Sequence, residues 1–62
     1  MEKQQTPNLF WTVDKIAEHL SVSIRTVRRW IADEKLIAHH FGGAVRISTA
    51  DFRSFLKNNR HD

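Results

Sequence analysis

The stretch SVSIRTVRRW, residues 21–30, decides how the rest of the chain is interpreted, because it mixes basic and apolar side chains in one short segment. At about 100° per residue, one side of a helix collects four apolar side chains, those of Ile24, Val27, Trp30 and Ile31. The other side carries Arg25, Thr26 and Arg29, with Arg28 at the edge of the apolar stripe. The segment therefore predicts an amphipathic helix whose basic face is either solvated or a surface for an acidic partner.

The composition indicates one small domain with its own core. A chain of 62 residues buries only about 60% of its unfolded surface, and 40% of these residues are hydrophobic. Because there is no cysteine, a disulfide scaffold, a thiolate metal site and a thiol nucleophile are excluded. No apolar run has the length of a membrane span, and MEKQQTPN lacks the apolar centre of a signal peptide, so we expect a cytoplasmic protein. The net charge of +3 is compatible with an anionic partner.

Three helices are predicted, and each begins at a hydroxyl side chain that can cap it. Thr12 caps a helix that runs to Leu20, and Ser23 caps the arginine-bearing helix, which runs to Ala32. Ser48 opens a third helix. The apolar stripes of the first and third helices are Val13, Ile16, Ala17 and Leu20, and Phe52, Phe55 and Leu56.

Two further patterns support these helix starts. Asp51, three residues after Ser48, completes a capping-box pattern. A large or branched apolar residue precedes each cap and another follows four residues after it, which is the spacing of a hydrophobic staple. The pairs are Trp11 with Ile16, Val22 with Val27, and Ile47 with Phe52.

The stretch LIAHHFGGAVRI, residues 36–47, predicts a β-hairpin, because paired glycines accept the positive φ angles of tight turns. Two registers are open. A two-residue loop places Phe41 opposite Ala44, whereas a three-residue loop with a bulge pairs Phe41 with Val45. We prefer the second register, which places on the core face Ile37, Phe41, Val45 and Ile47. It turns outward His40, Ala44 and Arg46.

The predicted fold is mainly α with a small β-hairpin, in the order α-α-β-β-α. We expect a flexible arm over residues 1–9, the folded domain over residues 10–57 and a tail over residues 58–62. Two short helices with a tight break between them match a helix-turn-helix, and a glycine hairpin that follows matches a wing. In that motif the second helix enters the major groove of DNA, where arginine forms two hydrogen bonds with guanine.

At this level of detail the chain resembles the small winged helix-turn-helix excisionases within the broader MerR-like group. The resemblance is carried by WTVDKIAEHLSVSIRTVRRWIADEKL and HHFGGAVRISTADFRSFL, and it covers Trp11 to Leu56. Its most specific parts are VSIRTVRRWI, the GGAVRI that follows, and the pair Asp51 and Phe52 beyond.

The resemblance implies a recognition helix that carries the contact residues Ser23, Arg25, Thr26, Arg28 and Arg29. It also implies a wing that carries His40, Ala44 and Arg46. Two departures stand out. Family wings often have arginine or lysine where this chain has His40 and Ala44, and a glycine is usual in the turn where this chain reads Asp33, Glu34 and Lys35. We therefore expect a left-handed residue at or near Glu34.

Within the recognition helix we expect Arg25 and Arg29 to contact base edges and Arg28 to contact a flanking phosphate. The Thr26 hydroxyl can make either kind of contact. The main role that we expect for Ser23 is to cap the helix, and binding a phosphate is a compatible second role. On the wing, protonation would give His40 the charge that family wings carry, so we hypothesise a pH-dependent DNA contact there. The four large aromatic residues assigned to the core are Trp11, Trp30, Phe52 and Phe55.

No pattern of catalytic or metal chemistry is present. Serine, histidine and aspartate all occur, yet none lies in a nucleophile elbow, a phosphate loop or a cluster with ligand spacing. His39 and His40 are adjacent in a predicted strand and point to opposite faces, so no zinc site is predicted. We expect no enzyme activity, no cofactor and no small-molecule substrate.

The resemblance implies a cofactor-free architectural protein that binds double-stranded DNA in the nucleoid, bends it and biases a site-specific recombinase (an integrase) toward excision. The implied partners are that recombinase or further copies of the chain on neighbouring sites. A small transcriptional regulator on the same fold is the first alternative. A protein-interaction module whose basic helix binds an acidic protein surface is the alternative from another class.

Overall fold

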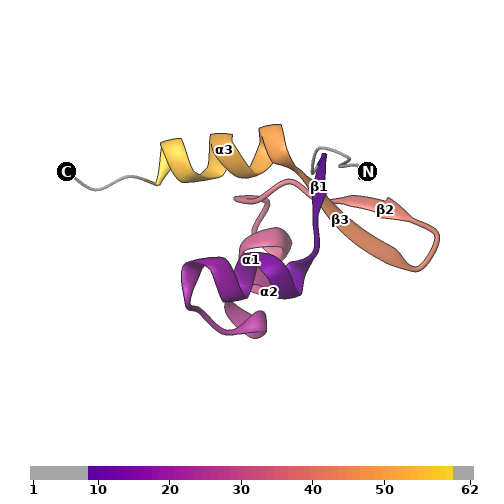
Figure 1. Ribbon diagram of the computed structural model, residues 1–62, viewed down its shortest axis with the longest axis horizontal. Coiled ribbons are helices and arrows are strands. Elements are labelled where there is room, and N and C mark those ends of the chain that lie inside the picture. The colour runs from indigo at the N-terminus through magenta and orange to yellow at the C-terminus, as the bar shows by residue number, and fades with distance from the viewer. Residues whose placement is uncertain (1–8, 60–62) are drawn as a thin grey trace, which may run out of the picture.

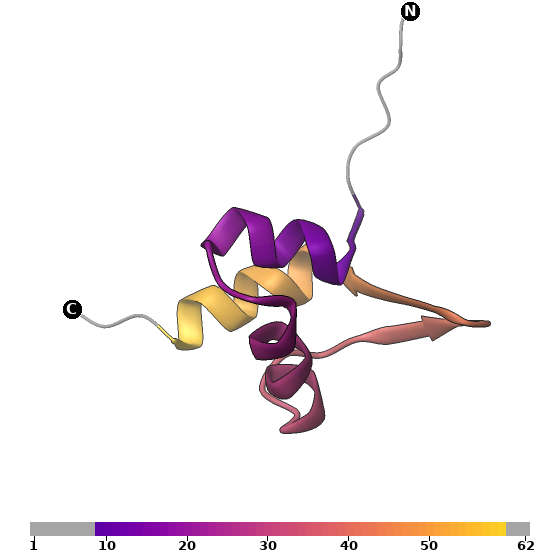
Figure 2. The ribbon, with the colours of Figure 1, turned by 90° about the horizontal axis from the view of Figure 1, so that it is seen from below.

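The computed structural model describes residues 9–59 and shows three helices and three short strands. In chain order these are β1 (Phe10–Trp11), α1 (Val13–Leu20), α2 (Ile24–Ala32), β2 (His39–Phe41), β3 (Ala44–Ser48) and α3 (Thr49–Asn58). The predicted order α-α-β-β-α is confirmed, with β1 as an additional element before it. The hairpin of β2 and β3 projects away from the helices in both views (Figures 1 and 2). No helix in this part of the chain is long and apolar enough to cross a membrane.

The predicted arm and tail lie mostly outside the described residues. Of the arm, residues 1–9, only Leu9 is described, and its carbonyl accepts a hydrogen bond from the Thr49 amide at 2.9 Å. Of the tail, residues 58–62, the structure describes Asn58, which ends α3, and Asn59, which follows it.

All three predicted helix caps are confirmed. The side-chain oxygen of Thr12 accepts a hydrogen bond from the Lys15 amide at 3.1 Å at the start of α1. Ser23 accepts in the same way from Thr26 in α2, and Ser48 accepts from Asp51 at 3.0 Å in α3. Each cap satisfies one amide that the first turn of a helix leaves unpaired.

Helices α1 and α2 both end in a left-handed residue that is not glycine. Ser21 has a φ of 58° after α1, and Glu34 has a φ of 62° after α2, as expected from the missing glycine. The next amide in each case donates to the carbonyl five residues back, Val22 to Ala17 and Lys35 to Trp30, both at 2.9 Å. This is the Schellman pattern, which reverses the chain tightly. The pattern after α1 creates the short turn between the two helices, and the one after α2 ends that helix before the wing.

The preferred hairpin register was wrong. Phe41 pairs with Ala44 and His40 pairs with Val45, so the loop contains only Gly42 and Gly43. Gly42 is the only one of the two with a positive φ, 63°, which is the pattern of a type II′ turn whose twist suits a two-residue hairpin.

This register changes which side chains the sheet buries. Phe41 and Ile37, both expected on the core face, are 54% and 57% exposed. Phe41 instead packs edge-on against Phe10 of β1, with the ring centroids 5.5 Å apart. The sheet order β1-β3-β2 brings these two strands to one sheet, and β1, which was not predicted, supplies the aromatic partner. His40 correspondingly lies on the same face as Val45, not on the outer face with Ala44.

The core forms where α1, α2, β3 and α3 meet. Seven apolar residues are buried: Ile16, Ala17, Val27, Leu36, Ile47, Phe52 and Phe55. The two tryptophans are half-buried at its edges, where Trp11 lies 4.7 Å from Phe52 and Trp30 lies 4.8 Å from Phe55 between ring centroids. Two residues expected in the apolar stripes, Ile24 and Leu56, are exposed instead.

Candidate nucleic-acid interface

The outer face of α2 carries three arginines, Arg25, Arg28 and Arg29, and all three side chains are exposed. Asp33 is the one acidic residue at helical spacing from any of them, four positions after Arg29. Within residues 9–59 none of these three guanidinium groups forms a hydrogen bond or an ion pair. Their charges are therefore available to an anionic partner.

The N-terminus of α2 adds two hydroxyl groups to this face. The side-chain oxygens of Ser23 and Thr26 lie 2.9 Å apart, and Ser23 also accepts from the Thr26 amide at 3.1 Å. In such a pair one hydroxyl donates to the other, so the accepting hydroxyl keeps its own proton for an outside acceptor. Ser23 is exposed and Thr26 half-buried, which places Ser23 nearer to any ligand.

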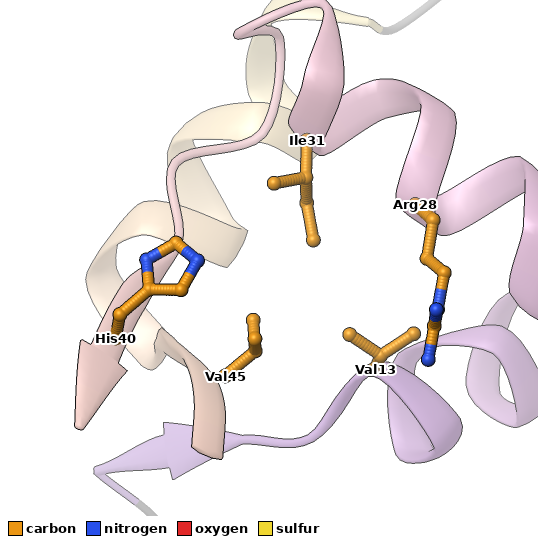
Figure 3. Close-up of a pocket in the computed structure, with 5 residues that line it drawn as sticks. All are labelled: Val13, Arg28, Ile31, His40 and Val45. Carbon is orange, nitrogen blue, oxygen red and sulfur yellow. The ribbon is translucent and has the colours of Figure 1, made fainter. Parts of the chain in front are cut away.

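A pocket of about 200 Å³ lies between α2 and the wing, by which we mean β2, β3 and the turn at Gly42 and Gly43. Its lining residues are Val13, Arg28, Ile31, His40 and Val45. Arg28 and His40 stand on opposite sides of it, and the three aliphatic side chains reach into the space between them (Figure 3). Sequence reasoning missed this pocket because its walls come from four separate elements, α1, α2, β2 and β3.

The candidate wing residues are divided between the two faces of the hairpin. His40 lies on the side of α2, whereas Arg46 pairs with His39 on the opposite face. The Arg46 guanidinium donates from Nη1 to the carbonyl of Val45 at 2.8 Å and is half-buried. Arg46 nevertheless lines a second hollow together with Arg28 and Gly43, beside the start of α1. The expected outward position was wrong for His40, which the register places on the face of Val45, whereas Ala44 and Arg46 share the outer face as expected.

His39 connects the wing to α3, a contact that the sequence did not reveal. Its Nε2 lies 3.0 Å from Oδ2 of Asp51, which also accepts a hydrogen bond from the Ser48 hydroxyl at 2.8 Å. The Ser48 hydrogen bond, followed by that from His39, lowers the pKa of the Asp51 carboxyl below its ordinary value. Between residues 9 and 59 there is no group of three or more histidine and acidic side chains that could hold a metal ion.

The arrangement is therefore two short helices joined by a tight turn, with an exposed basic face on the second and a projecting hairpin beside it. No curated protein and no solved structure gives a significant match to the chain. A family model described as a helix-turn-helix domain matches residues 12–60, which covers all three helices and the hairpin. The chain therefore belongs to the helix-turn-helix domain family of DNA-binding proteins.

Proposed function

We propose that this protein is an excisionase-type architectural factor, which binds duplex DNA next to a site-specific recombinase and favours excision. The observation that carries the proposal is a set of three exposed guanidinium groups on one face of α2, the second helix of the motif. None of them has a partner among residues 9–59. The sequence resemblance to small excisionases supports the finer assignment. Such a factor acts on DNA in the cytoplasm, and it needs no cofactor and catalyses no reaction itself.

In this proposal α2 enters the major groove and the wing follows the neighbouring minor groove. Arg25 and Arg29 bind base edges, where a guanidinium can form two hydrogen bonds with guanine. Arg28 and Ser23 bind phosphates, which set affinity and orientation but carry no sequence information. Thr26 contacts either a base or a phosphate through its hydroxyl, and Arg46 contacts the backbone from the outer face of the wing.

A domain of three short helices and a small sheet offers DNA a small contact area. Specific protein–DNA interfaces of single modules bury about 600–1,000 Å², which gives limited affinity. Useful binding therefore requires further copies on adjacent sites or a recombinase that holds the protein in place. Several bound copies along one duplex would also bend it, which is how such a protein could direct recombination.

Selection of bound fragments from a random pool of duplex DNA tests this function. Tandem copies of a short motif, spaced by about one helical turn, support cooperative architectural binding. One isolated or palindromic motif would favour a transcriptional regulator on the same fold. Recovery of no motif would contradict the DNA proposal and favour a protein-interaction module.

A second test separates base contacts from phosphate contacts. Arg25→Ala and Arg29→Ala should each weaken binding to the selected site by about 1–3 kcal/mol and relax the preference at one base pair, whereas Arg28→Ala should weaken all sequences alike. Lys57→Ala, which removes an exposed charge from α3, is the matched control and should change little. Equal losses on matched and random DNA for Arg25→Ala would reject its assignment as a base reader.

The salt dependence of the same binding measurement provides an independent check. If four to six phosphates are neutralised, the logarithm of affinity falls with the logarithm of salt concentration with a slope of about −4 to −5. Arg28→Ala should make that slope shallower by about one. A flat salt response of the unaltered protein would contradict a DNA-binding role for the basic face.

A further inference from the structure

The pocket between α2 and the wing lies where one strand of bound DNA would have to pass. The major and minor grooves of a duplex are separated by a single sugar–phosphate backbone. If α2 occupies the major groove and the wing the adjacent minor groove, that backbone crosses the space between the two elements. In this protein the space is the pocket lined by Arg28 and Ile31 of α2, His40 and Val45 of the wing, and Val13 of α1.

We propose that this pocket binds one sugar–phosphate unit of the DNA backbone, with Arg28 and His40 on either side of the phosphate. The inference rests on the proposed DNA-binding mode and assigns a site within it. Arg28 supplies a fixed charge and a planar set of donors from α2. The His40 ring supplies a donor from the wing, and a second positive charge when it is protonated.

The floor of the pocket suits the sugar. Val13, Ile31 and Val45 are aliphatic and half-buried, and their side chains reach into the space between the two basic groups (Figure 3). The carbon-bound hydrogens of deoxyribose pack on such a surface, while its phosphate points toward the charged groups. At about 200 Å³ the pocket is smaller than the roughly 300–1,000 Å³ of pockets that hold drug-sized ligands or cofactors, which favours a single backbone unit.

The charged groups around His40 leave this role open to a phosphate. Arg28 faces His40 across the pocket. Glu34, which follows α2, lines a neighbouring hollow together with His40. Asp14 of α1 and Arg46 of β3 line the hollow on the far side of Arg28. Among residues 9–59 none of these groups forms an ion pair with His40. A phosphate between Arg28 and His40 would supply the missing negative charge and would favour the protonated ring.

The first test measures binding to a fluorescein-labelled duplex of the selected site at pH 6 and pH 8, at constant ionic strength. The unaltered protein should bind about three- to tenfold more tightly at pH 6, because one histidine gains a charge at the phosphate. His40→Gln should remove this difference. His19→Gln is the matched control, since His19 lies in the last turn of α1, does not line the pocket and should leave the difference in place.

His40→Arg provides a variant that gains function. It should bind at pH 8 at least as tightly as the unaltered protein binds at pH 6, and its affinity should no longer change between the two pH values. Circular dichroism at both pH values checks that each variant is folded. A pH difference that survives His40→Gln, or one that disappears in His19→Gln, would overturn the proposal.

The second test maps the phosphate itself with a series of duplexes, each with one phosphate replaced by a neutral methylphosphonate. The proposal predicts one position at which the replacement weakens binding by the unaltered protein. On the duplex with that replacement, Arg28→Ala and His40→Gln should cause no further loss of affinity at pH 6. If the losses of affinity caused by the two variants map to different phosphates, Arg28 and His40 do not share one phosphate and the proposal is overturned. If His40→Gln changes nothing while Arg25→Ala and Arg29→Ala still lose binding, the pocket assignment fails and the proposed function stands. If no arginine variant loses binding, the proposed function itself fails.

Discussion

His39 Nε2 lies 3.0 Å from Asp51 Oδ2, so a side-chain contact joins β2 of the wing to the first turn of α3. The same carboxylate oxygen accepts from the Ser48 hydroxyl at 2.8 Å, while the Asp51 amide donates to the Ser48 oxygen at 3.0 Å. Asp51 therefore holds both the capping residue Ser48 and the strand that carries His40. The position of the wing relative to α2 depends partly on this contact.

We expect the stability of the protein to fall in acid partly through Asp51. The pKa of this carboxyl is lowered from 3.8 by the Ser48 and His39 hydrogen bonds. A lowered pKa in the folded state adds stability above the unfolded value, and this stability is lost as the pH falls below about 4 and through the folded value. Urea unfolding at pH 7, 5 and 3 measures it.

Asp51→Asn should be less stable than the unaltered protein at pH 7 and should lose less stability between pH 5 and pH 3. Asp14→Asn, in the first turn of α1, is the control, because no hydrogen bond from a described side chain holds its carboxylate. Ser48→Ala should lower the free energy of unfolding by about 1 kcal/mol, as loss of a helix cap does. An acid response that is identical in Asp51→Asn and the unaltered protein would show that this contact has no role.

Substitutions at Leu36 and Ile37 test which of these two neighbours is packed in the core. Leu36 is 1% exposed and Ile37 is 57% exposed, although the sequence pattern favoured Ile37 for the core. Leu36→Ala should lower the free energy of unfolding by about 2–5 kcal/mol, because it leaves a cavity among buried side chains. Ile37→Ala should change it by less than about 0.5 kcal/mol. Chemical denaturation of both variants measures the two values, and the reverse ranking would contradict the observed register.

We expect the protein to be more stable with glycine at position 34 than with Glu34. Its φ of 62° is costly for a residue with a side chain, whereas glycine adopts it freely. Glu34→Gly should therefore raise the free energy of unfolding by about 0.5–1 kcal/mol, after the flexibility that glycine adds to the unfolded chain is included. Asp33→Gly, one residue earlier with a φ of −85°, should lower it by a similar amount. Thermal melting of the two variants distinguishes backbone strain from a general effect of glycine.

The two glycines of the wing should respond differently to alanine. A Cβ at either position meets nothing within 4 Å, so space is not limiting. Gly42 has a φ of 63°, and Gly42→Ala should destabilise the protein by about 1 kcal/mol through backbone strain alone. Gly43→Ala should have little effect, since its φ is not in the left-handed region. Equal destabilisation by the two variants in urea unfolding would argue against the type II′ turn.

The features that the sequence predicted correctly depend on residues close together in the chain. A helix cap joins residues three positions apart, and a left-handed helix end involves residues within five positions. The basic face of α2 follows from the helical period alone. For this reason the sequence alone predicts the helix cap at Ser23, the outer position of the arginines and the left-handed conformation near Glu34.

The features that it did not predict join residues from different elements. The period of a strand is two, so both hairpin registers fit the local pattern, and the choice between them reverses the face of every side chain in β2 relative to β3. The Gly42 turn and the packing of Phe10 of β1 on Phe41 accompany the observed register, and β1 has only two residues and no pattern of its own. The contact of His39 with Asp51, and the position of His40 opposite Arg28 across the pocket, follow from that register.

The sequence by itself thus determined the helices, their caps and the basic face of α2, because these depend on local hydrogen bonds and on the helical period. Only the tertiary structure decided the wing register, the burial of Leu36 in place of Ile37, and the pocket between Arg28 and His40. Those features depend on which distant side chains meet in three dimensions, and the free energy of packing decides that for the molecule as a whole.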